Sequence, residues 1–118
     1  MSLIFLSNVA LVQNPFIIRN TDAYLSKFYK VNSPWTGSSL TLYTYLHACL
    51  IWFALYQFWK VALKSTLFPH DKVREQFSKC RSGFEKGLLL DRVQNASPVI
   101  SSDLQEVIKE AQEIVLNS

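Results

Sequence analysis

The chain has 118 residues, enough for one modest domain or for a membrane span with two flanking segments, which excludes two folded domains. Charged residues make up only 18%, below the usual quarter, so the chain is poor in charge for its size. A net charge of +3 with no basic stripe and no nucleic-acid motif argues against a nucleic-acid partner.

Residues 1–36 are expected to form an amino-terminal interfacial segment. The apolar run before Pro15 is too short for a span of about 20 residues, and it lacks the basic start of a cleaved signal. An interfacial or protein-packed segment is therefore favoured. The alternative is that residues 1–18 form a second membrane-embedded helix. Tyr24, Leu25, Phe28 and Tyr29 recur at helical spacing, which predicts a short helix at the headgroup level.

Residues 37–63 are predicted to be a transmembrane helix that follows a turn at Pro34 and Gly37 and is capped by Ser38 or Ser39. Every residue from Val31 through Trp59 is uncharged, whereas the outward face of a helix in water needs charge. The helix would extend about 36 Å, enough to cross a hydrocarbon core of about 30 Å. The rest of the sequence offers too little apolar surface to wrap it. The expected membrane-interface anchors are Trp35, Tyr56, Trp59, Lys60 and Lys64.

Two features of this helix suggest contacts with other helices. Small residues spaced by three or four predict a helix-packing face, which consists of Gly37, Thr41, Thr44 and Ala48. His47 lies near the middle, where an ionisable side chain is a functional hypothesis by default. Because no second ligand lies at a useful spacing, a neutral, hydrogen-bonded His47 is favoured, and contact with haem or quinone is the weaker alternative.

Residues 64–118 are predicted to form a carboxyl-terminal amphipathic helical region. One helix follows Pro69, and a loop from Asp91 to Ser101 leads to a closing helix that Ser102 and Gln105 would cap. The closing helix has an acidic outer face. The apolar stripes of the two helices predict partner docking through Val73, Phe77, Phe84, Leu104, Ile108 and Val115.

The sequence contains no recognised catalytic or metal-binding motif. This predicts that the chain is not an enzyme and holds no cofactor or metal. A structural lipid is the one small molecule considered possible. Glu106 and Glu110 are read as a solvated helix face. The predicted fold class is all-α: a single-pass transmembrane helix flanked by amphipathic helices, with no independent globular core.

This architecture is typical of accessory subunits of membrane assemblies. The function expected is a non-catalytic, supernumerary subunit that stabilises a respiratory-chain complex of the mitochondrial inner membrane. Its partners would be other subunits and the lipid bilayer. The excess of lysine and arginine after residue 59 places the carboxyl-terminal side in the matrix. The alternatives are a small subunit of the ATP synthase membrane region or of a photosynthetic complex, and a single-span membrane tether or assembly factor.

Overall fold

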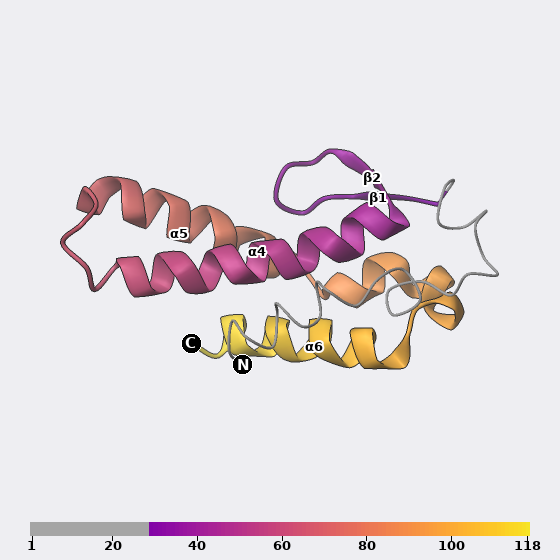
Figure 1. Cartoon of the computed structure of the whole chain (residues 1–118). Coiled ribbons are helices and arrows are strands. Elements are labelled where there is room, and N and C mark those ends of the chain that lie inside the picture. The colour runs from indigo at the N-terminus through magenta and orange to yellow at the C-terminus, as the bar shows by residue number, and fades with distance from the viewer. Residues whose placement is uncertain (1–28) are drawn as a thin grey trace.

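The computed structural model describes residues 29–118, which form a bundle of helices with a small β-hairpin at one end (Figure 1). The expectations for the amino-terminal segment before Tyr29 lie outside the described residues. The elements in chain order are β1 (Lys30–Asn32), β2 (Ser39–Thr41), α4 (Leu42–Ala62), α5 (His70–Phe84), the 3₁₀ helix η2 (Leu89–Val99) and α6 (Ser102–Leu116).

The hairpin is antiparallel, with Val31 opposite Leu40. The expected turn at Pro34 and Gly37 is confirmed. Ser33 organises it, because its hydroxyl oxygen accepts hydrogen bonds from the backbone N–H groups of Trp35 and Thr36, each at 3.2 Å. Gly37 has φ +77°, a left-handed conformation that a glycine adopts without strain. The turn therefore directs Trp35 into the helical body, where it is 7% exposed.

α4 begins directly after β2, later than the sequence predicted. Thr41 is its cap: the Thr41 hydroxyl oxygen accepts a hydrogen bond from the Thr44 N–H at 3.3 Å. Ser38 and Ser39 stay outside the helix, because Ser39 pairs with Asn32 in the hairpin.

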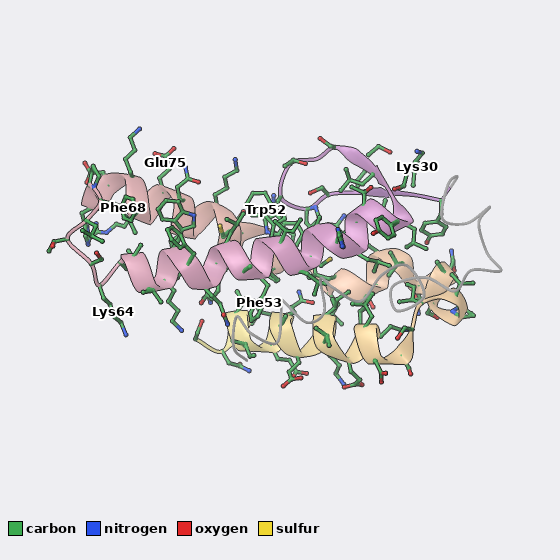
Figure 2. The ribbon with its side chains drawn as sticks, viewed as in Figure 1. Lys30, Trp52, Phe53, Lys64, Phe68 and Glu75 are labelled. Carbon is green, nitrogen blue, oxygen red and sulfur yellow. The ribbon has the colours of Figure 1, made fainter. Side chains whose placement is uncertain are left out.

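α4 is the central element, and two other helices cover most of its length. α5 runs back along one flank after the connection at residues 63–69, and α6 lies along the other (Figure 1). Trp52 and Phe53 leave α4 on different sides, and Phe53 points toward α6 (Figure 2). Phe53 has no exposed surface, and neither have Leu42, Tyr45 and Leu46. A continuous apolar core therefore runs between α4, α5, η2 and α6.

The predicted fold class is wrong in its main point. Among residues 29–118, none of the helices combines the length and the sustained apolar character needed to traverse a bilayer. The uncharged window is divided between a hairpin and a helix, and α4 includes His47, Gln57 and several hydroxyl-bearing side chains. The expectation that no core would form is wrong as well. α5, η2 and α6 together supply the apolar surface that seemed to be missing, through Phe84, Leu89, Val93, Leu104, Ile108 and Val115 among others.

The connection between α5 and α6 is a 3₁₀ helix, where the sequence predicted a loop. Leu89, Val93 and Ala96 point inward from it and are almost completely buried. The cap of α6 is Ser101, one residue before the expected Ser102, and its hydroxyl accepts from the Leu104 N–H at 3.3 Å. Gln105 donates instead to the carbonyl oxygens of Ser97 and Ile100.

Candidate docking surfaces

The aromatic residues expected at membrane boundaries lie mostly inside the helical body. Trp35 stacks on Trp52 with ring centroids 5.5 Å apart, and its indole N–H donates to the Cys80 carbonyl at 2.8 Å. Tyr56 is buried against Phe77 and hydrogen-bonds through its hydroxyl to Ser118. The structure therefore does not bring Trp35 and Tyr56 to a boundary.

The expected docking residues of α5 and α6 face each other and α4. Five of the six are buried, and Phe77 is half-buried; the five are Val73, Phe84, Leu104, Ile108 and Val115. Two polar side chains, Gln112 and Arg81, join the end of α5 and the segment after it to α6. The Gln112 amide donates to the Phe84 and Gly87 carbonyls at 2.8 Å and accepts from the Leu89 N–H at 2.9 Å. Arg81 donates to the Val115 carbonyl at 2.9 Å, near the end of α6, where a cation is favourable. The apolar stripes of α5 and α6 therefore pack against other helices of the same chain.

The predicted helix-packing face is divided by the fold. Gly37 lies in the turn and Thr41 caps α4, whereas Thr44 and Ala48 share the outward side of α4. His47 is partly exposed there, with its ring 5.1 Å from that of Tyr43.

An exposed apolar surface with flanking lysines lies where α4 turns into α5. We call it the tip, and it consists of Val61, Leu67 and Phe68 together with Lys60, Lys64 and Lys72. Leu67 is 84% exposed and Val61 is 71% exposed. Phe68 contacts Phe58 and Trp59 edge to face, with ring centroids 6.2 and 5.9 Å apart. Figure 2 shows Phe68 and Lys64 at this same end of the molecule. Large apolar side chains exposed in this way make the tip a candidate docking surface.

The charges of the molecule are distributed unevenly around the tip. Residues 58–75 carry four lysine or arginine side chains against two carboxylates. α6 carries four carboxylates against Lys109 alone, and its residues lie beneath α4, away from the tip (Figure 1). The tip is therefore net positive and α6 is net negative, a distribution that favours contact of the tip with an anionic surface.

A second apolar surface follows the outward side of α4. We call it the outer stripe, and it consists of Thr44, Ala48, Ile51, Leu55 and Phe58. These residues recur every three or four positions, so they share one side of the helix. Ile51 is 54% exposed, Phe58 is 47% exposed and Leu55 is 38% exposed. None of the stripe residues is charged.

Two ionisable groups inside the core, Cys49 and Tyr45, are held in their neutral forms. Burial raises the pKa of the Cys49 thiol to about 12, and it raises the pKa of the neighbouring Tyr45 hydroxyl well above its usual range. The Tyr45 hydroxyl donates to the Leu89 carbonyl at 2.7 Å. Both cysteines are free thiols, and Cys80 is buried too. These groups stabilise the core and are not poised for nucleophilic chemistry.

One hollow in the described part of the chain lies between η2 and α6 and has a volume of about 290 Å³. Its walls are mostly apolar, and Leu88 and Leu116 open it to the surface, while its rim mixes Asp91 and Glu113 with Lys109. Both signs of charge on the rim give no preference for a charged ligand. Over residues 29–118, no group of three or more histidine, cysteine, aspartate or glutamate side chains is arranged to hold a metal ion.

Comparison with protein-family models, curated sequences and solved structures gives no significant match to this chain.

Proposed function

We propose that this chain is a non-catalytic accessory or tethering protein that attaches to the surface of an anionic membrane through the tip, without crossing it. The observation that carries the proposal is the exposure of Leu67, Val61 and Phe68 beside three lysines. An apolar projection with a basic border is the combination that interfacial membrane binding uses, since apolar side chains enter the headgroup region while cations meet anionic lipids.

The magnitudes support a reversible attachment. Complete burial of a leucine or phenylalanine side chain contributes about 1.5–3 kcal/mol, and partial entry into the headgroup region contributes less. Each lysine near an anionic surface contributes about 1 kcal/mol more. Leu67 and Phe68 lie in the connection between α4 and α5, so they can enter the headgroup region while both helices keep their own hydrogen bonds.

Vesicle flotation tests this proposal. Wild-type protein should float with vesicles that contain phosphatidylglycerol, and it should bind vesicles of pure phosphatidylcholine weakly. Leu67→Glu should lower the partition constant of the protein between vesicles and water by at least about tenfold. It replaces the most exposed apolar side chain by a carboxylate. Lys64→Gln should lower it about fivefold.

Leu88→Glu is the matched control, because Leu88 is 58% exposed and lies away from the tip, at the start of η2. Its vesicle binding should equal that of the wild type. Equal binding to neutral and anionic vesicles, or equal losses for Leu67→Glu and Leu88→Glu, would overturn the proposal.

The location that we propose is the mitochondrial inner membrane, with the chain as a peripheral member of a respiratory assembly. The free thiols and the mild basicity support this setting. Alkaline carbonate should release the protein from isolated membranes. Retention in the membrane after carbonate treatment, or recovery with another organelle, would contradict this part of the proposal.

A further inference from the structure

Within residues 29–118 the outer stripe is an exposed helix face, and only Phe58 at its carboxyl-terminal end also touches the tip, through Phe68. Its residues lie over four turns of a helix that is about 31 Å long. The side of α4 facing α5 and α6 is already covered, and Phe53, Tyr56 and Leu46 have almost no exposed surface there. A partner would therefore meet a straight apolar seam with no charge on it.

Large and small residues are separated along this seam. The amino-terminal half presents Thr44 and Ala48, and the carboxyl-terminal half presents Leu55 and Phe58, with Ile51 between them. If two such helices run in opposite directions about an axis at Ile51, Phe58 lies level with Thr44 of the second copy, and Leu55 lies within about 1.5 Å of Ala48 along the axis. Each bulky side chain then meets a small one, as close packing of helices requires.

The charges favour the same direction. Lys60 is the one charged residue within α4, and Lys64 follows just beyond its end. Parallel helices would set these lysines beside those of the second copy and would align the two helix dipoles. Antiparallel helices centred on Ile51 separate the two Lys60 side chains by about 27 Å along the axis, beyond the screening length of about 8 Å.

We propose that the outer stripe is the interface of an antiparallel homodimer whose two-fold axis passes near Ile51. A two-fold interface uses the same surface of both subunits, so it needs a surface that complements itself. The outer stripe meets this condition in side-chain size and in charge.

Cysteine cross-linking of the full-length chain tests the geometry. Ile51→Cys should form a disulfide with itself under mild oxidation. Leu55→Cys alone should not, because its two copies lie about 12 Å apart along the axis. A mixture of Ala48→Cys and Leu55→Cys proteins should form a mixed disulfide. The native Cys49 and Cys80 are buried and should stay reduced, and Leu88→Cys serves as the exposed control.

Light scattering after size exclusion tests the association itself. The wild type should show a mass that rises from 13.6 kDa toward twice that value as concentration increases. Ile51→Glu should raise the dissociation constant by at least about tenfold, because two carboxylates would meet at the axis. Leu88→Glu should leave the dissociation constant unchanged, and circular dichroism should confirm that both variants are folded.

A wild-type protein that stays monomeric at every concentration would overturn the proposal and would assign the outer stripe to another segment or to another protein. Self-cross-links of Ala48→Cys and of Leu55→Cys would overturn the antiparallel geometry. Neither result depends on vesicle binding by the tip, so the two proposals can fail separately.

Discussion

Single residues decide where Trp35 can lie, and Gly83 is the clearest case. Trp35 comes from the hairpin turn, stacks on Trp52 and meets Phe84 edge to face at 5.0 Å. A Cβ on Gly83 would lie 2.2 Å from the Trp35 indole nitrogen, so α5 can admit the ring only because Gly83 has no side chain. This contact helps to attach the hairpin to the helices, together with the hydrogen bonds from Lys86 to the Pro34 carbonyl and from Arg92 to the Asn32 carbonyl.

Gly83→Ala should therefore destabilise the protein although alanine is the better helix former. The expected loss is about 1–3 kcal/mol in the free energy of unfolding, as for overpacking of a core, with a change in near-ultraviolet circular dichroism. Ser78→Ala, at an exposed position of the same helix, should be neutral or slightly stabilising. A Gly83→Ala protein as stable as the wild type would show that Trp35 is not held against α5.

The buried thiol of Cys49 makes stability depend on alkaline pH. In the unfolded chain this thiol ionises near pH 9, and in the folded chain burial holds its pKa at about 12. Between these values the unfolded state has lost a proton that the folded state keeps. The free energy of unfolding should therefore fall as pH rises from 9 toward 12. Urea unfolding across this range measures the slope.

Cys49→Ala should make that slope shallower, whatever it does to absolute stability, because one of the titrating groups is removed. The Tyr45 hydroxyl, whose pKa burial also raises, should leave a residual slope in this variant. Ser78→Ala should keep the wild-type slope. An unchanged slope in Cys49→Ala would mean that Cys49 is accessible to water.

At the level of elements, Gln112 joins α6 to the connection between α5 and η2. Its side chain is 4% exposed and makes three hydrogen bonds to the backbone. Leucine has a similar size but no polar atoms, so the Phe84 carbonyl and the Leu89 N–H would remain buried without this partner. Leaving such groups unsatisfied costs about 1–3 kcal/mol each.

Gln112→Leu should accordingly lower the free energy of unfolding by about 2–4 kcal/mol. Gln94→Leu, at an exposed position of η2, is the control and should change stability by less than about 0.5 kcal/mol. Thermal and urea unfolding measure both. A loss no larger than that of the control would show that α6 docks through its apolar face alone.

Sequence periodicity located the helices well, because α5 and α6 have regular apolar stripes. It failed for the uncharged window, where composition alone was read as a span. The contacts that make α4 a core helix join residues far apart in the chain, such as Tyr45 with Leu89 and Trp35 with Cys80. No local pattern reports such contacts. The 3₁₀ helix was not predicted, because proline and asparagine are typical of loops and this segment contains Asn95 and Pro98.

The candidate surfaces were predicted only in part. The sequence named Lys60, Lys64 and Trp59 as membrane-interface anchors, and the structure places them at or beside the exposed tip. Leu67 and Phe68 were missed because two apolar residues before a proline give no periodic signal. Ile51 and Leu55 were hidden among equally apolar neighbours, and only the packing of α5 and α6 distinguishes the outward side from the inward one.

At the scale of the whole molecule, the two proposals together predict a bridge between membranes. An antiparallel pair of α4 helices would place the two tips at opposite ends. Wild-type protein should therefore cluster anionic vesicles, measured as turbidity. Ile51→Glu should bind the vesicles without clustering them, and Leu67→Glu should do neither. If the Ile51→Glu protein still clusters vesicles, membrane bridging does not require the outer stripe.

The central claim is that the tip, and no other part of residues 29–118, enters the membrane surface. Its most direct test is an environment-sensitive fluorophore placed on Leu67→Cys and, separately, on Leu88→Cys, since the native thiols are buried. With anionic vesicles, the Leu67→Cys label should shift to the blue and be quenched by lipids that carry a shallow nitroxide, while the Leu88→Cys label stays unchanged. An unshifted label at position 67, or equal shifts at both positions, would contradict the claim.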